Sequence, residues 1–371
     1  MRILYVTDGI APFVIGGMQT ISKTHVEWLV GAGHKVLLVT SRIREADRPN
    51  LPCRSIVLPW PNRRCVSRLS PWRYADELRN YSRSIITIAA DFKPEVVYSE
   101  GPLLDLYLEV PAHQRAPTIF HPHGLEMFQH KGSLWEDAKS FPLKGIVARH
   151  CRRADLVISY GGRLTPMIKS TGARPERMAV LTNSAPAAAA TRPMRDNGNR
   201  LLFVGRPEAR KGVKILLDAI KSLDDVTLDL VGVDSYSGQN NSNVHFHGAT
   251  RDISAILQHY MRANFLVVPS YAEGMPTVVL EAFSTGLPAI ASDVGAMNEL
   301  VVGGKTGFLV EPGSSSALRA AIVEAVRLSK DSYSQLCQNC LTLAQGAYSP
   351  AAVRKRLFDI FDQARAAGVV G

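Results

Sequence analysis

The stretch that decides the fold is residues 269–288, which read Pro-Ser-Tyr-Ala-Glu-Gly-Met-Pro-Thr-Val-Val-Leu-Glu-Ala-Phe-Ser-Thr-Gly-Leu-Pro. The apolar run before it, Phe265 to Val268, is typical of a buried strand. After a loop rich in Pro and Gly, a mostly apolar helix is predicted from about Met275 to Gly286. The free N–H groups of its first turn favour an anion such as a diphosphate. The stretch therefore predicts a strand, a loop and a helix with an anion-binding N-terminus.

Two glutamates flank this helix N-terminus. Glu273 lies in the loop and Glu281 follows eight residues later. At 1.5 Å per residue, Glu281 lies roughly 10 Å below the helix start. A carboxylate at each end and a phosphate between them would suit a sugar nucleotide, which presents ribose hydroxyls, a diphosphate and sugar hydroxyls. The alternative is that Glu273 caps the helix dipole and Glu281 is merely solvated.

The stretch resembles the Glu-x7-Glu signature of retaining glycosyltransferases of family 4, enzymes of the GT-B fold. The resemblance covers most of the chain in the right order, and the further matching segments are 3–7, 16–18, 33–36, 202–212, 265–272, 287–301 and 304–313. It implies an α/β protein with two doubly wound Rossmann-like domains facing a central cleft. It also implies transfer of a sugar from a nucleoside diphosphate, with retention of configuration.

The pattern along the chain agrees with two α/β units, because short apolar strands alternate with helical segments. In the first unit, helices are predicted over 18–31 and 73–92, and strands over 2–7, 35–40, 54–58, 95–98, 117–121, 155–159 and 178–182. In the second unit, strands are predicted over 200–204, 226–231, 243–246, 265–268, 288–291 and 307–310. We expect an acceptor-side domain over 1–185, an Ala/Pro/Gly-rich linker over 186–199 and a donor-binding domain over 200–348. The resemblance implies that a C-terminal helix within 349–371 packs back on the first domain.

The resemblance implies a donor site in the second domain. There Arg206 and Lys211, beside a helix N-terminus, would hold the diphosphate and stabilise its charge as it leaves, although two ordinary surface cations are the alternative. Glu281 would accept hydrogen bonds from the ribose and Glu273 would contact the sugar. The other donor-binding positions are backbone or base contacts, namely Val233, His247, Gly248, Gly274, Met275, Pro276 and Thr277.

The first domain would supply the opposite wall. Gly16 and Gly17 permit close approach of the backbone to a phosphate, and a plain tight turn is the alternative. His123, in His121-Pro-His-Gly, resembles the family's histidine near the anomeric carbon and is the predicted catalytic histidine. His121 is the competing assignment, and a loop histidine without a catalytic role is the other alternative. Glu100 and Glu126 are predicted on the acceptor side.

The chain departs from the family pattern in two places. Asn183-Ser184 replaces Asn-Gly after the last strand of the first domain, and Gly295-Ala296 replaces a Gly-Gly pair, where a looser backbone approach is expected. The sequence has no Asp-x-Asp, the metal-chelating device of GT-A enzymes. We therefore expect no metal and no other cofactor, with Arg206 and Lys211 taking the electrostatic role of Mg²⁺.

Composition is that of a globular chain of about two domains, with 371 residues of which 46% are hydrophobic and 20% charged. No apolar run approaches the roughly 20 residues that span a bilayer. The first residues predict a strand and show no signal-peptide pattern. Five cysteines, with Cys337 and Cys340 in a helical pattern, suggest no disulfide framework. We expect a cytoplasmic protein.

Positive charge is concentrated in the first half of the chain. Residues 1–195 hold 27 Lys and Arg against 16 Asp and Glu, whereas residues 196–371 hold 16 against 17. The densest segment, Trp60–Arg83, interleaves arginines with Trp60, Trp72 and Tyr74. Such a segment suits an anionic membrane surface on the inner face of the cytoplasmic membrane. An ordinary solvated face is the alternative, and a nucleic-acid partner is not expected because no recognition motif accompanies the charge.

The sequence thus predicts a metal-independent glycosyltransferase with a saccharide or lipid-linked acceptor, in the synthesis of a cell-surface polysaccharide or glycoconjugate. Two alternatives remain open. One is a GT-B-fold nucleotide-sugar epimerase, which breaks the same bond without a sugar acceptor and needs acid and base carboxylates. The other is a catalytically silent, membrane-associated subunit that binds a sugar nucleotide.

Overall fold

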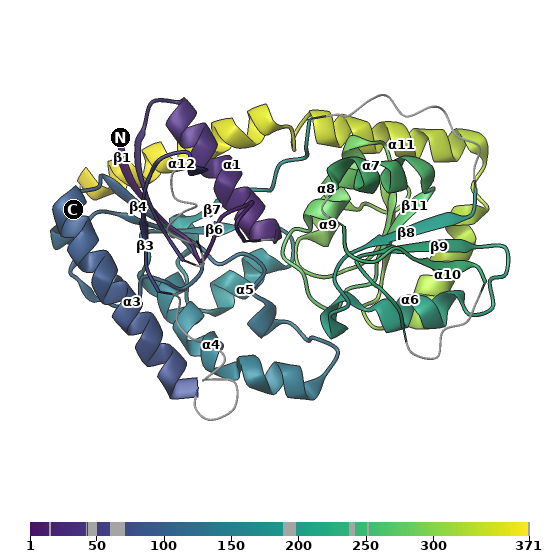
Figure 1. Ribbon diagram of the computed structural model, residues 1–371, viewed down its shortest axis with the longest axis horizontal. Helices are drawn as coiled ribbons and strands as arrows, with labels where there is room; N and C mark the ends of the chain where they lie inside the picture. The colour runs from purple at the N-terminus through teal and green to yellow at the C-terminus, as the bar shows by residue number, and fades with distance from the viewer. Residues whose placement is uncertain are drawn as a thin grey trace. The chain divides into compact units, whose positions relative to one another are not determined.

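The computed structural model describes residues 1–14, 16–41, 43, 50–59, 71–187, 198–236, 242–250 and 252–369. The chain divides into two compact units (Figure 1). Unit 1 contains residues 1–128, 138–182 and 354–371, and unit 2 contains residues 129–137 and 183–353. These boundaries differ from the expected ones, because residues 129–137 group with unit 2. Most of the expected linker, residues 188–197, lies outside the described residues.

Unit 1 contains a seven-stranded sheet in the order β3-β2-β1-β4-β5-β6-β7. All neighbouring strands are parallel. The strands are β1 (Arg2–Val6), β2 (Lys35–Thr40), β3 (Arg54–Val57), β4 (Val96–Glu100), β5 (Thr118–His121), β6 (Leu156–Ser159) and β7 (Met178–Val180). They confirm the predicted strands to within one or two residues at each end.

The helices of unit 1 connect these parallel strands. They are α1 (Gly17–Gly31), α3 (Pro71–Phe92), α4 (Leu134–Arg153, whose first turn groups with unit 2) and α5 (Leu164–Ser170). Short 3-10 turns are η2 (Tyr107–Glu109), η3 (Ala112–Gln114), η4 (Glu126–Phe128) and η5 (Pro175–Arg177). The last helix, α12 (Pro350–Val369), packs on unit 1, where the Phe361 ring stacks on Tyr98 with centroids 5.5 Å apart.

Unit 2 contains a six-stranded parallel sheet in the order β10-β9-β8-β11-β12-β13. Its strands are β8 (Arg200–Val204), β9 (Thr227–Val231), β10 (Val244–Phe246), β11 (Phe265–Val268), β12 (Ala289–Ser292) and β13 (Gly307–Val310), again as predicted. Its helices are η6 (Ala209–Lys211), α6 (Val213–Ile220), α7 (Ile253–Arg262), α8 (Thr277–Ser284), α9 (Met297–Leu300), α10 (Ser315–Val326) and α11 (Lys330–Gln345). The helix predicted from Met275 begins two residues later, because Pro276 is extended with φ −70° and ψ 123°.

The order of the strands marks one ligand position in each sheet. In unit 1 the chain moves outward from β1 to β2 and β3 and then returns to β4 on the other side of β1. In unit 2 the same reversal separates β8 from β11. Ligands of doubly wound sheets bind beyond the carboxyl ends of the strands at this reversal point. The loops after β8 and β11, and those after β1 and β4, are therefore the places to look for a site.

Candidate active site

The loop after β11 buries the carboxylate of Glu273. This side chain keeps 7% of its exposure, and its Oε1 lies 2.6 Å from Lys211 Nζ and 2.7 Å from Ser270 Oγ. The guanidinium of Arg210 lies 3.9 Å from the second oxygen, Oε2. Burial alone would raise the pKa of Glu273, but Lys211 and Arg210 outweigh it and hold that pKa below its ordinary value. The carboxylate is thus ionised, oriented and held from the neighbouring loop after β8.

The cations after β8 have different surroundings. Lys211 was predicted to hold a diphosphate, and in the structure its ammonium pairs with Glu273 and keeps 19% of its exposure. Arg206 keeps 70% of its exposure and lies 2.9 Å from Glu208 Oε1, while Arg210 lies 2.9 Å from the other oxygen of that carboxylate. Arg206 is thus the more exposed cation of this loop, and the ammonium of Lys211 also orients Glu273.

Close contacts between backbones fix the Glu273 loop. A Cβ added to Gly212, which has φ +70°, would lie 2.0 Å from the carbonyl oxygen of Pro269. A Cβ added to Gly295, which has φ +57°, would lie 2.3 Å from the carbonyl oxygen of Glu273. The backbone N–H of Ala296 donates to the carbonyl of Gly274 at 2.9 Å. The looser approach expected at Gly295-Ala296 is thus wrong, because the first residue of the pair alone makes the close contact.

Two residues that sequence reasoning missed complete this loop. Gln129 donates from Nε2 to the carbonyl oxygen of Glu273 at 2.7 Å. Asn183 donates from Nδ2 to the carbonyl oxygen of Met275 at 2.7 Å, which fixes the loop just before α8. Gln129 has no local sequence signal, and Asn183 has only its place in the Asn183-Ser184 pair; neither points to a loop more than 90 residues away. The Asn183-Ser184 pair lacks the glycine of the family's Asn-Gly pattern but keeps the asparagine, whose side-chain amide holds the loop.

Glu281 lies two turns into α8 and is held differently. The hydroxyl of Tyr260, a buried residue on α7, donates to its Oε2 at 2.8 Å. The alternative that the Glu281 carboxylate is merely solvated is therefore wrong, because Tyr260 holds it. Tyr260 is a further residue that sequence reasoning missed, although its place in the apolar stripe of α7 marks it as buried.

The positions predicted to contact the base come together after β9 and β10. Gly248 donates from its N–H to the carbonyl of Val233 at 3.1 Å and accepts from the N–H of Gly232 at 2.6 Å. Nε2 of His247 lies 2.8 Å from Asp229 Oδ1. These three predicted positions thus form one turn-to-turn contact at the carboxyl ends of adjacent strands.

Gly16 and Gly17 stand at the N-terminus of α1, as predicted. A Cβ added to Gly16 would lie 2.2 Å from the side-chain oxygen of Gln19, whose amide donates to Asp8 at 2.8 Å. A side chain at position 16 would thus meet only the end of the Gln19 side chain, which can move aside, so packing does not require a glycine here. This observation also fits the plain-turn alternative.

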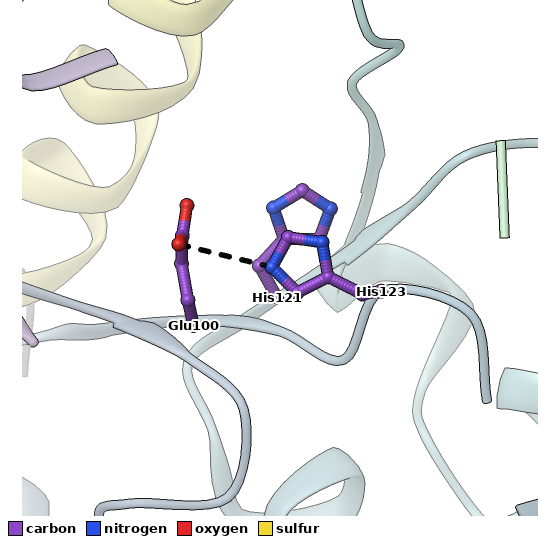
Figure 2. Close-up of side chains that lie close together, drawn as sticks. All are labelled: Glu100, His121 and His123. Atoms are coloured by element: carbon purple, nitrogen blue, oxygen red, sulfur yellow. Dashed lines mark ion pairs between the residues drawn. The ribbon is translucent and has the colours of Figure 1, made fainter. Parts of the chain in front are cut away.

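The ends of β4 and β5 and the start of the loop after β5 bring together Glu100, His121 and His123 (Figure 2). The two imidazoles stack with centroids 4.0 Å apart, and His123 Nε2 lies 4.0 Å from Glu100 Oε2. His123 has φ +57° and its Nδ1 lies 2.8 Å from the Tyr160 hydroxyl. Burial lowers the pKa of His123 to about 3, so this imidazole is neutral at physiological pH. His121 is more deeply buried, and its Nδ1 lies 2.7 Å from the Tyr98 hydroxyl.

Glu100 does not fit the acceptor contact predicted for it. Its side chain is fully buried, and it accepts hydrogen bonds from the hydroxyls of Tyr5, Thr7 and Ser22. Burial raises its pKa to about 7. The strand pattern could not reveal this, because an acidic residue at the end of a strand is equally compatible with exposure. Glu126 lies half-buried in η4, after the His123 loop.

The basic surface predicted in the first half is partly neutralised. Residues 60–70, which include Trp60 and Arg63, lie outside the described residues. Arg79 lies 3.1 Å from Asp105 and 3.0 Å from Glu109, and Arg149 lies 2.8 Å from Asp105. These arginines therefore form an ion-pair network within unit 1 and do not constitute a free cationic face.

Comparison with known proteins gives matches over both halves of the chain. Residues 16–184 match the family model described as a glycosyl transferase 4-like domain, and residues 198–327 match the model of glycosyl transferases group 1. An uncharacterized glycosyltransferase of Methanocaldococcus jannaschii is 33% identical over 133 residues, which are 34% of this chain and 37% of that protein. The alignment thus spans about a third of that relative.

Two longer matches cover nearly the whole chain. Glycogen synthase of Mycobacterium tuberculosis is 25% identical over 359 residues, covering 87% of this chain and 85% of that protein. The crystal structure of Anabaena HepE in complex with UDP superposes with a TM-score of 0.71 at 19% identity, covering 98% of this chain and 100% of that one. The structural match shows that the two folds are the same.

Proposed function

The chain belongs to the family 4 glycosyltransferases of the GT-B fold, and we propose that it transfers a sugar from a nucleoside diphosphate to a saccharide or lipid-linked acceptor with retention of configuration. The bond from the anomeric carbon to the diphosphate breaks, and a bond to an acceptor hydroxyl forms on the same face. The hydroxyl's proton leaves with the diphosphate.

One observation carries this proposal, the oriented carboxylate of Glu273 at the N-terminus of α8. Lys211 and Ser270 fix its Oε1, and the loop lies at the carboxyl ends of β8 and β11, where the strand order reverses. A buried carboxylate ordered in this way is suited to accept hydrogen bonds from sugar hydroxyls. The free N–H groups of the α8 N-terminus are suited to a diphosphate beside it. Carboxylate and anion site are thus combined in one loop.

We assign the other contacts to the donor from the exposure and the bonding partners of each side chain. Arg206, the exposed cation of the loop, is assigned to the diphosphate, and its charge would stabilise the leaving group. Glu281, whose second oxygen is held by Tyr260, is assigned to the ribose. His123 is assigned to the transferred sugar, where a neutral imidazole and the backbone carbonyl can face the positive charge that develops at the anomeric carbon. The turn of Val233, His247 and Gly248 is assigned to the base.

We propose a uridine nucleotide as the donor by analogy with HepE, which was crystallised with UDP, although the fold itself also accepts ADP in a starch synthase of Arabidopsis thaliana. The glycogen synthase relative supports a place in polysaccharide synthesis. A panel of UDP-, GDP- and ADP-sugars in a thermal-shift assay tests the donor. A ligand present at 100 times its Kd stabilises the fold by about 2.7 kcal/mol. Absence of any shift with all three classes, or a shift with GDP- or ADP-sugars alone, would overturn the proposal of a uridine donor.

Transfer is proposed to need no metal, because Arg206, Lys211 and the helix N-terminus supply the positive charge at the diphosphate. Activity should therefore survive EDTA. Activity that EDTA abolishes and Mg²⁺ or Mn²⁺ restores would contradict this part of the proposal.

We propose that the protein associates peripherally with an anionic membrane and that the acceptor is presented there. Leu134, Trp135 and Phe141 are exposed by 84%, 69% and 68% on the first turns of α4. Lys144 lies 5.9 Å from the ring of Phe141. Exposed aromatic and aliphatic side chains beside lysine are suited to the interfacial layer of a bilayer. Within the described residues, no helix is long and apolar enough to cross a membrane.

A further inference from the structure

We propose that Glu100, His121 and His123 form a binding site for a divalent transition metal, with Zn²⁺ as its best-fitting ion. Glu100 ends β4, His121 ends β5 and His123 follows two residues later, so three ligand residues meet at or just beyond the ends of adjacent strands. One ligand atom from each residue lies within 4.8 Å of the other two. Figure 2 shows the carboxylate of Glu100 beside the two stacked imidazoles.

The first argument is the charge of Glu100. Its carboxylate is fully buried, and three hydroxyl groups solvate it, but hydroxyls carry no charge. Among the described residues, the groups within ion-pair distance that can become positive are the imidazoles of His25 and His123, and no lysine or arginine lies that close. A buried carboxylate is paired with a cation, coordinates a metal or takes up a proton. A metal ion between Glu100 and the imidazoles would place a positive charge beside this carboxylate.

The second argument is the state of the two imidazoles. Both Nε2 atoms are buried and have no hydrogen-bond partner among the described residues. Both Nδ1 atoms face a phenol oxygen, that of Tyr98 for His121 and that of Tyr160 for His123. Metal-binding histidines usually donate their second ring N–H to an oxygen, which fixes the tautomer. With Nδ1–H donated to each tyrosine, the lone pair of each Nε2 is the one available to a metal.

The set of ligands then narrows the choice of ion. Two imidazole nitrogens and one carboxylate oxygen are a known ligand set of Zn²⁺, and Fe²⁺ and Co²⁺ accept the same atoms. The His123 side chain keeps 14% of its exposure, whereas Glu100 keeps none. The more exposed side of the site therefore lies at His123, and an ion would enter from that side.

A second cluster in unit 2 provides a matched control. Asp229, His247 and His259 also bring three ligand atoms within 4.8 Å of one another. There, however, His247 Nε2 already has a hydrogen bond to Asp229, at 2.8 Å, and the nearest cation to that carboxylate is Arg200 at 3.8 Å. Among the described residues, the second cluster thus lacks the buried, unpartnered imidazole nitrogens of the Glu100 cluster.

The test titrates Zn²⁺ into tag-free protein that has been treated with EDTA and desalted, and follows heat by calorimetry. We expect one saturable site per chain. His121→Ala and Glu100→Gln should each lower its affinity by about 100-fold or more, while His259→Ala should leave it unchanged. Tyr98→Phe keeps the fold's shape but removes the oxygen behind His121, and should cost about 10- to 100-fold, the usual effect of a residue behind a metal ligand. Circular dichroism checks that each variant is folded.

Co²⁺ provides a second measurement, since its visible spectrum reports the ligands directly. The spectrum of the wild-type protein should change in His121→Ala and stay the same in His259→Ala. Failure to bind Zn²⁺, or binding that only His259→Ala abolishes, would overturn the proposal and leave Glu100 neutralised by a proton. If Glu100→Gln or His121→Ala does not fold, Tyr98→Phe decides between these outcomes.

The metal site has a consequence for activity, which rests on the proposal above that His123 contacts the donor sugar. A metal on Nε2 of His123 would remove that group from the sugar, so Zn²⁺ should inhibit transfer and EDTA should reverse the inhibition. The binding measurement needs no donor or acceptor. Its failure and the failure of the proposed glycosyl transfer can therefore be told apart.

Discussion

The Nζ atom of Lys211 lies 2.6 Å from Oε1 of Glu273, so two residues that the sequence assigns to different parts of the donor form a single ion pair. The pair joins the loops after β8 and β11, the two strands between which the order of the sheet reverses. A substitution of Lys211 therefore changes the electrostatic surroundings and the position of the Glu273 carboxylate, and a substitution of Glu273 does the same to the Lys211 ammonium. Effects of substitutions in such a pair are not additive.

Because Lys211 pairs with the buried Glu273 and Arg206 does not, substitutions of these two cations should differ in their effect on the free energy of unfolding. Arg206→Ala and Lys211→Ala should each slow transfer by roughly 10²- to 10³-fold, the effect of losing one preorganised charge. Lys211→Ala should also destabilise the protein by about 1–3 kcal/mol, because it leaves the buried Glu273 carboxylate with a weaker set of partners. Arg206→Ala removes an exposed side chain and should change stability by less than about 0.5 kcal/mol. Urea denaturation and initial rates of both variants would check this, and equal stability would contradict it.

The two glutamates should differ in their effect on binding. Glu281→Ala should weaken the binding of the free nucleoside diphosphate, because this carboxylate is assigned to the ribose. Glu273→Ala should largely spare that binding and impair transfer, since the free nucleotide lacks the sugar. Calorimetry with UDP measures both, and Tyr260→Phe serves as a milder version of Glu281→Ala, because it removes only the hydroxyl that holds Oε2. Equal losses of UDP affinity in both alanine variants would refute the division.

The ionisation of Glu273 should also be visible in stability against pH. Its pKa in the folded protein lies below the ordinary value, so its contribution to stability is present above the unfolded pKa, near 4.5, and is lost as the pH falls through the folded pKa. Glu273→Gln, which keeps the shape, should lower stability at pH 7 and flatten its decline below pH 4.5. Thermal denaturation from pH 3 to 7 would check this. A variant with the wild-type slope would mean that other carboxyl groups account for acid sensitivity.

The Glu273 loop should tolerate no side chain at Gly295. Gly295→Ala forces φ +57° on a residue with a Cβ, which would lie 2.3 Å from the carbonyl oxygen of Glu273. We expect a loss of more than about 2 kcal/mol in stability, together with lost activity. Gly31→Ala is the matched control, because no atom lies within 4 Å of its added Cβ and its helical conformation favours alanine. A Gly295→Ala variant as stable as Gly31→Ala would contradict the close packing.

The strands were predictable because each is a short apolar run bounded by turn residues, and parallel strands in two α/β units leave few topologies. Glu273 and Glu281 were predictable from one local pattern. The residues that hold them were not, since Gln129, Asn183 and Tyr260 are brought close only by the fold. The burial of Glu100 was likewise unpredictable, because it depends on the hydroxyls of Tyr5, Thr7 and Ser22 from other elements.

Membrane docking should depend on both charge and apolar contact. Binding to vesicles of anionic lipid should weaken steeply with salt, since the Debye length falls from about 10 Å at 0.1 M to about 3 Å at 1 M. Charge reversal at Arg63, Arg64 and Arg68, which lie outside the described residues, should weaken binding at low salt. Lys214→Glu is the control for the change in net charge, because this lysine of α6 is 71% exposed and lies outside the basic half of the chain.

Apolar contact is tested by Trp135→Ser with Phe141→Ser, which should weaken the binding that remains at high salt. Co-sedimentation with anionic and neutral vesicles measures all of these variants. Equal and weak binding to both kinds of vesicle at low salt would exclude the membrane and point to a soluble acceptor. Binding that survives the arginine reversals but not the serine substitutions would assign docking to α4, because only its exposed side chains would then account for the attachment.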